Sequence, residues 1–108
     1  GEEDMRKIIV YWKKKFAAKK YEVCHGCRIA DATGERDMEG GDSPGKVIEV
    51  GIDQTCQDNI CLVVKDANRG MNRFNVRVET SDGWSKWSKH ANFDVQEAGF
   101  PTHVHDEL

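Results

Sequence analysis

Apolar and polar residues alternate along several short stretches of this chain, and this period of two constrains the fold more than any other feature. In the first stretch, across about residues 6–13, Ile8, Val10 and Trp12 would share one face of a strand. Five further strands are expected around Tyr21–His25, Val47–Val50, Ile60–Val64, Phe74–Val78 and Ala91–Val95. Short strands joined by turns predict an all-β fold, an antiparallel β-sandwich.

A helix is the competing interpretation of residues 5–20, because Ile8, Trp12 and Phe16 are spaced four residues apart. The run Ile8 to Trp12, however, consists of β-branched and aromatic residues, which favour strands. A strand is therefore the prediction for this segment.

Length and composition indicate one domain with a modest core, since the chain has 108 residues, of which 38% are hydrophobic and 32% charged. Residues 1–96 are expected to form the sandwich, residues 28–45 within it a flexible acidic insertion loop, and residues 97–108 a C-terminal tail. No apolar stretch approaches the roughly 20 residues that span a bilayer, so no membrane insertion is expected. The net charge of −3 argues against nucleic acid as the main partner.

The four cysteines form two close pairs, Cys24 with Cys27 and Cys56 with Cys61. An even number in local pairs is typical of disulfides made in the secretory pathway. Thiol–disulfide exchange at the first pair and zinc binding by both pairs are the alternatives. A redox motif normally opens a helix, and the spacings do not fit a zinc knuckle, so we predict structural disulfides, no metal and no cofactor. Their connectivity stays open.

Two tryptophans, Trp84 and Trp87, lie three residues apart in the block Trp-Ser-Lys-Trp-Ser, shortly after the strand expected at residues 74–78. This spacing suits neither a helix face nor a buried strand, so both rings are expected on a surface. Arg77 would stack between the two indoles, and each cation–π contact would contribute roughly 0.5–1 kcal/mol when exposed. We expect this ladder mainly to stabilise the fold.

The ladder is also a candidate binding surface, because Trp and Arg are common anchors of protein interfaces. Arg73 or Lys86 would extend it beyond Arg77 and the tryptophans. A protein partner is the expected ligand of such a surface.

These features together resemble the fibronectin type III domain, and the W-S-x-W-S pattern is similar to the box of class I cytokine receptors. The resemblance covers about residues 6–96 and rests on Trp12, Ala18, Tyr21 and Val23, on Phe74 to Val78, and on Trp84 to Ser88. It implies an immunoglobulin-like sandwich in which Trp12 lies on strand B, Phe74 to Val78 form strand F, and the box begins strand G. It also implies a non-catalytic module that binds protein.

The chain departs from the family pattern at three places. Only residues 1–5 precede the strand of Trp12, so the usual first strand is short or missing, and a sheet edge would need cover from the tail or from a partner. Phe74 stands where the family usually has a tyrosine. Glu79 stands where a second arginine is usual, which predicts a shorter ladder.

Five lysines surround Phe16 in the segment expected to join the first two strands: Lys13, Lys14, Lys15, Lys19 and Lys20. Such a run is usually a solvated loop, but it is also able to bind a polyanion, such as a sulfated glycan or an acidic peptide. The acidic insertion at residues 28–45 would compete for these lysines if it lay nearby.

The last four residues, His105, Asp106, Glu107 and Leu108, match a retrieval signal of the endoplasmic reticulum. This match predicts retention in the lumen by a retrieval receptor, and a secreted or extracellular location is the alternative. His103 and His105, with His90, would be able to sense pH, although we expect the first two in a flexible tail.

No catalytic motif is present, neither a nucleophile elbow nor a paired-histidine metal motif nor a phosphate-binding glycine loop. We therefore predict a non-enzymatic binding module. A receptor-like extracellular module, a thiol–disulfide protein and a polyanion-binding module are the alternatives.

Overall fold

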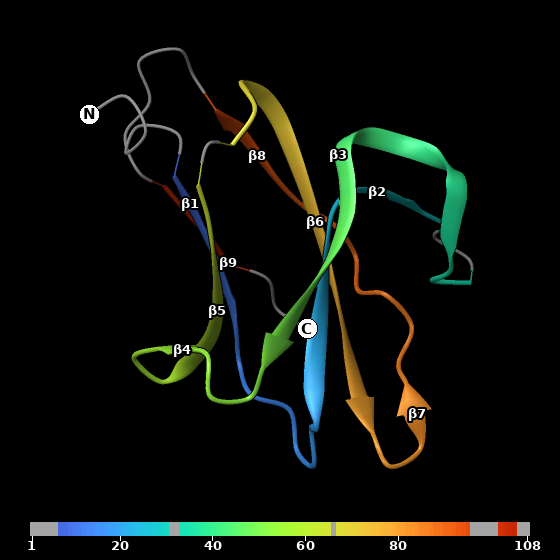
Figure 1. The fold of residues 1–108 in the computed structure, drawn as a ribbon, viewed down its shortest axis with the longest axis vertical. Helices are drawn as coiled ribbons and strands as arrows, with labels where there is room; N and C mark the ends of the chain where they lie inside the picture. Colours follow the sequence, from blue (N-terminus) through green and yellow to red (C-terminus); the bar gives the residue numbers. More distant parts are fainter. Residues whose placement is uncertain (1–6, 31–32, 66, 96–101, 106–108) are drawn as a thin grey trace.

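The computed structural model describes residues 7–30, 33–65, 67–95 and 102–105, and these residues form an all-β fold (Figure 1). Its strands are β1 (Ile8–Trp12), β2 (Lys20–Ile29), β3 (Arg36–Gly51), β4 (Thr55–Cys56), β5 (Asn59–Val64), β6 (Gly70–Thr80), β7 (Gly83–Trp84), β8 (Ala91–Val95) and β9 (Thr102–His105). Among the described residues there is no helix with the length and apolar character needed to cross a membrane.

The strands form two sheets, in the orders β4-β5-β1-β9 and β3-β2-β6-β7, with β8 also pairing with β6. All pairs are antiparallel except β1 with β9. Side chains from both sheets enter one apolar cluster, as expected for the predicted β-sandwich. The helical interpretation of residues 5–20 is wrong, because residues 8–12 are β1.

The core follows from the alternation in the sequence. In β1 the buried residues are Ile8, Val10 and Trp12, while the residues between them are half-buried. Tyr21 on β2 meets Trp12 edge to face, with ring centroids 5.5 Å apart, and both side chains are fully buried. Aromatic pairs in this geometry add about 0.5–1.5 kcal/mol beyond the burial of their area.

The C-terminal segment supplies the strand that covers the open edge of β1. Thr102 to His105 pair in parallel with Ile8 to Tyr11, so β9 lies along the edge of β1 that β5 leaves open (Figure 1). Residues 102–105 are therefore a strand of the sheet, contrary to the expectation of a flexible tail. An unpaired edge exposes backbone donors and acceptors, and pairing with β9 satisfies them.

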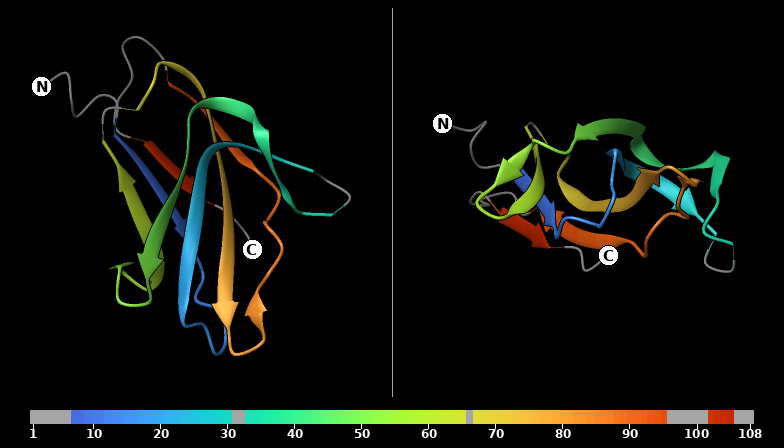
Figure 2. Two further views of the ribbon diagram at one scale, coloured as in Figure 1. Left: turned by 45° about the vertical axis from the view of Figure 1, so that its right-hand side comes forward. Right: turned by 90° about the horizontal axis from the view of Figure 1, so that it is seen from below.

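Much of the predicted insertion loop, residues 28–45, is β-structure instead. β2 continues to Ile29 and β3 begins at Arg36, so the two strands form a long hairpin that projects beyond the sheets (Figure 2). The pairing shifts register around Cys27, next to Gly26, whose φ of 78° suits glycine. Backbone pairing along β2 thus outweighed a composition that favours a loop.

Candidate functional site

The ladder lies on the outer face of the β3-β2-β6-β7 sheet. The guanidinium carbon of Arg77 lies 4.5 Å from the ring centroid of Trp84 and 4.6 Å from that of Trp87. Trp84 has a second cation beside its ring, because the ammonium nitrogen of Lys20 lies 5.8 Å from the ring centroid. The order along the face is therefore Lys20, Trp84, Arg77 and Trp87.

Arg77 is fixed in this position by Glu22, which is its partner across β2 and β6. The Nε atom of Arg77 donates to Glu22 Oε1 at 2.7 Å, and Nη2 donates to the same oxygen. Both side chains are partly buried, so the pair neutralises a charge that the two indoles remove from water. The plane of the guanidinium is thereby held for stacking.

Two serines fasten the tryptophan segment to β6. The hydroxyl of Ser85 accepts a hydrogen bond from the backbone nitrogen of Val78, and that of Ser88 accepts one from Val76. The backbone nitrogens of Ser85 and Ser88 donate in turn to the carbonyls of Val78 and Val76. Small hydroxyl residues are needed here, because each satisfies a strand N–H that no neighbouring strand reaches.

Trp87 is buried rather than exposed, contrary to the sequence-based expectation. Only 8% of its surface is accessible, because it packs with Cys24, Cys27 and Ile29 in a second apolar cluster, here called the outer-face cluster. Cys24 and Cys27 form a disulfide with each other. Trp84 remains half-exposed.

The second disulfide joins Cys56 and Cys61. Each cysteine is therefore bonded to its near neighbour in the sequence, which settles the connectivity that the sequence left open. This bond links β4 to β5 at the edge of the other sheet. The two disulfides are typical of proteins in an oxidising, secretory-type environment.

Lys20 takes the place in the ladder that we expected Arg73 or Lys86 to take. The stem of Lys86 instead lies over Gly34, where an added Cβ would come within 2.7 Å of Lys86 Cβ. Arg73 lies opposite Asn92 on β8. The sequence did hold a signal for Lys20, because alternation along β2 puts it on the same face as Glu22.

The loop between β1 and β2 presents Phe16 with 97% of its surface exposed. The loop is held by three hydrogen bonds: the backbone nitrogen of Lys15 donates to Tyr21 Oη at 2.9 Å, that of Ala18 to Lys15 O at 3.3 Å, and that of Lys19 to Glu79 O at 2.8 Å. An aromatic ring is thus displayed on a braced turn with no packing role of its own.

The predicted basic loop is divided by the fold. Lys13, Lys14 and Lys19 are exposed on the β1–β2 loop and Lys15 is half-exposed, whereas Lys20 belongs to β2. Lys20 Nζ lies 3.2 Å from Glu49 Oε1, and the hydrogen bond and charge of Glu49 raise the pKa of the lysine. The end of the β2–β3 hairpin, where β2 stops at Ile29 and β3 begins at Arg36, lies far from the basic loop and does not cover it (Figure 1).

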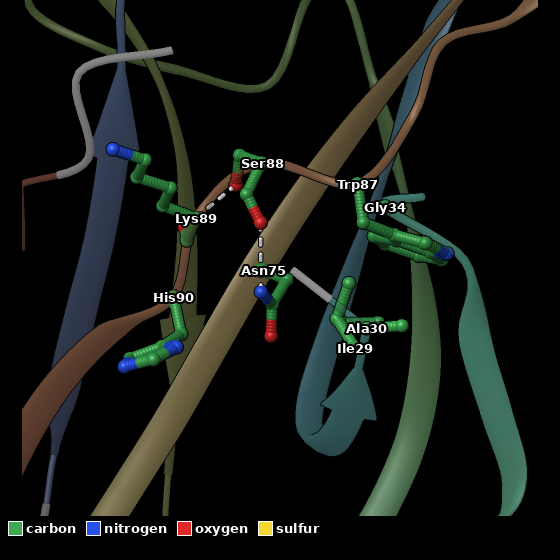
Figure 3. A pocket seen from close by; sticks show the side chains of 8 residues that line it. All are labelled: Ile29, Ala30, Gly34, Asn75, Trp87, Ser88, Lys89 and His90. Carbon is green, nitrogen blue, oxygen red and sulfur yellow. Dashed lines mark hydrogen bonds between the residues drawn. The ribbon is translucent and has the colours of Figure 1, made fainter. Parts of the chain in front are cut away.

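A cavity of about 490 Å³ opens beside the outer-face cluster (Figure 3). It is lined by Ile29, Ala30 and Gly34 at the end of the β2 segment, by Asn75 on β6, and by Trp87, Ser88, Lys89 and His90. No sequence pattern predicted this cavity, because the residues that line it come from three distant segments.

His25 is a buried histidine at one end of the main core. Its Nε2 atom lies 2.9 Å from Asn72 Oδ1, and its ring stacks on Phe74 with centroids 4.5 Å apart. Burial lowers the pKa of His25, with a smaller contribution from the charge of Lys46, while the hydrogen bond to Asn72 opposes this shift. Phe74 is therefore a stacking partner at the position where the family pattern has a tyrosine.

The remaining predicted sites are placed only in part. His105 ends β9, and Asp106, Glu107 and Leu108 lie outside the described residues. His90 borders the cavity. No group of three or more His, Cys, Asp or Glu side chains suited to a metal ion occurs in the described part of the chain.

Comparison with protein-family models, with curated proteins and with solved structures gave no significant match for this chain. Its function is therefore argued from its own residues.

Proposed function

We propose that this chain is a non-catalytic, fibronectin type III-like module that binds a protein partner in the secretory pathway. The observation that carries the proposal is the exposed Phe16 on its braced loop. Three hydrogen bonds from backbone nitrogens on either side of Phe16 brace the loop that exposes its ring. Preorganised aromatic anchors are characteristic of protein-binding surfaces.

The two surfaces expected from sequence are largely occupied within the chain itself. The rings of Trp84 and Trp87 stack on Arg77, and β9 covers the edge of β1. The β1–β2 loop remains accessible, with Lys13, Lys14 and Lys19 around Phe16. An acidic partner with an apolar group suits this loop best, since lysines attract it and Phe16 supplies the contact.

A fibronectin type III-like identity is supported by the braced ladder, since both serines and both tryptophans of the box take part in it. A receptor-like extracellular module has the same support. Thiol–disulfide exchange has less, because Cys24 and Cys27 are fully buried in the middle of a strand, where an attacking thiolate has no access.

The proposed compartment is the lumen of the endoplasmic reticulum, because the His-Asp-Glu-Leu sequence of residues 105–108 matches the signal that a retrieval receptor binds. The test compares cells that express the natural full-length protein with and without these four residues. Retention that becomes secretion on deletion supports the lumenal location. Secretion of both forms excludes it and leaves the extracellular module as the proposal.

Partner binding is tested by introducing a photo-crosslinking phenylalanine analogue at Phe16 in the protein expressed in cells. The matched control carries the analogue at Met71, which is 54% exposed near the start of β6. A discrete protein adduct at Phe16 and not at Met71 is expected. Absence of any adduct at Phe16 would contradict partner binding by this loop.

The polyanion alternative predicts a different pattern. Heparin binding that falls steeply with salt, disappears in Lys13→Glu/Lys14→Glu and is unchanged in Phe16→Ser would favour it. A protein partner, in contrast, should be lost in Phe16→Ser.

A further inference from the structure

We propose that the cavity beside the outer-face cluster binds a tryptophan side chain of the partner, whose indole N–H donates to Oδ1 of Asn75. This proposal rests on the proposed protein-binding function and deepens it, because it names an anchoring side chain of the partner. It concerns a site apart from the β1–β2 loop, so the two can fail separately.

Asn75 carries a buried hydrogen-bond acceptor that no described residue satisfies. This residue is only 1% exposed, and its Nδ2 atom donates to the carbonyl of Ser88 at 2.8 Å. Oδ1 is buried and accepts no hydrogen bond from any described residue. Figure 3 shows this oxygen pointing away from Ser88, on the side of the amide opposite to Nδ2. A buried acceptor without a donor costs about 1–3 kcal/mol, which a suitable ligand would recover.

The residues that line the cavity suit the shape and the chemistry of an indole. Ile29, Ala30 and Trp87 give the cavity an apolar side, and its volume of about 490 Å³ lies in the range of pockets that enclose organic groups. An indole combines a flat apolar body with one N–H donor and no acceptor. Phenylalanine has no donor, and a lysine or arginine would carry a charge into an apolar site.

A tyrosine fits less well, because its phenol oxygen also seeks a donor. Two donors of the lining residues are already engaged: Asn75 Nδ2 with the carbonyl of Ser88, and Ser88 Oγ with the carbonyl of Lys89. The Lys89 ammonium and the His90 ring lie on the exposed rim, and Trp87 carries a further indole N–H.

The rim determines what should flank the tryptophan. Lys89 and His90 are exposed there, and among the described residues that line the cavity there is no carboxylate. Acidic neighbours of the tryptophan are therefore favoured. Because Oδ1 of Asn75 is buried, side chains that line the cavity have to shift before the indole N–H reaches it.

The test titrates the wild-type, disulfide-intact protein with the peptide acetyl-Asp-Trp-Glu-amide, followed by the side-chain amide resonances of Asn75 in NMR spectra. Two control peptides replace the tryptophan by 1-methyltryptophan, which lacks only the donor, or by phenylalanine. We expect the tryptophan peptide to shift the Asn75 amide and to bind at least about tenfold more tightly than either control. Equal binding of all three peptides, or no shift at Asn75, overturns the proposal.

Variants give an independent check. Ala30→Phe should fill the cavity and abolish the shift, whereas Val63→Phe adds the same ring on β5, outside the cavity, and should leave binding unchanged. Retained binding in Ala30→Phe would place the peptide elsewhere and overturn the site, while leaving the cross-linking result at Phe16 unaffected.

Discussion

The two apolar clusters of this protein lie on opposite faces of the same sheet and are built differently. The main core collects side chains such as Trp12, Tyr21 and Phe74 between the two sheets. The outer-face cluster, as far as the described residues show it, consists of Trp87, Ile29 and one disulfide, and it adjoins a stacked arginine. The first is stabilised by the amount of apolar surface it buries, and the second by a covalent bond and by charged contacts.

This difference has a physical origin. A single segment between β7 and β8 covers the outer face, and it provides too little apolar area to exclude water by packing alone. The disulfide, the Arg77–Glu22 pair and the two serine hydroxyls hold the segment in place instead. The outer-face cluster should therefore respond to reduction and to single polar substitutions more strongly than its small size suggests.

The largest effect is expected at the main core. Trp12→Ala should lower the free energy of unfolding by about 3–5 kcal/mol, because it leaves a large cavity between the sheets. Trp87→Ala should lower the free energy of unfolding by less, since the residues around Trp87 can relax toward solvent. Urea unfolding under non-reducing conditions measures both, and equal losses would contradict the distinction between the two clusters.

Removal of the Cys24–Cys27 disulfide by a double substitution to serine is the next largest change. Loop entropy alone predicts a loss of about 2 kcal/mol for so short a loop. Packing against Trp87 adds to this loss, because hydroxyls replace apolar sulfur in a buried cluster. The same double substitution at Cys56 and Cys61 should destabilise the fold less, because Cys56 is half-exposed. Thermal unfolding of the two variants measures the difference. The reverse order would show that the outer-face cluster contributes little.

Substitution of Arg77 tests the charged part of the outer-face cluster. Arg77→Ala should lower the free energy of unfolding by about 1–2 kcal/mol. The substitution removes two partly desolvated cation–π contacts and leaves Glu22 without its partner. Arg77→Lys should recover only part of this, because an ammonium cannot stack its plane between two rings. Arg28→Ala, at an exposed position on β2, is the control and should be nearly neutral. Full recovery with lysine would mean that charge alone matters.

The smallest effect concerns pH and belongs to the main core. Because burial lowers the pKa of His25 from its ordinary value of 6.5, the unfolded chain takes up a proton before the folded protein does. This part of the stability is present above pH 6.5 and is lost as the pH falls from there through the lowered pKa. The free energy of unfolding should change by no more than about 1.4 kcal/mol per pH unit, because one group titrates.

The measurement is the free energy of unfolding between pH 5 and 8, in wild type and in His25→Phe. The variant should lose the slope, whereas His90→Gln, at an exposed position, should keep it. A slope that persists in His25→Phe would assign the titration to another group.

The sequence by itself determined the parts of this protein that depend on neighbours along the chain. Alternation fixed which side of β1, β2 and β6 faces the core, because successive side chains of a strand point to opposite faces. The spacing of the two tryptophans and the preceding strand placed Arg77 between the indoles. Close cysteine pairs favoured disulfides, although their connectivity was left open.

Only the tertiary structure decided the features that join distant segments. The parallel pairing of β9 with β1 depended on which sheet edge remained open, and no local pattern records that. Lys20 entered the ladder because register across β2 and β6 set it beside Trp84. Trp87 became buried, and the cavity at Asn75 formed, because the segment after β7 folds back over the outer face. Local periodicity determines the face of a strand, whereas burial and edge pairing depend on what the rest of the chain places against it.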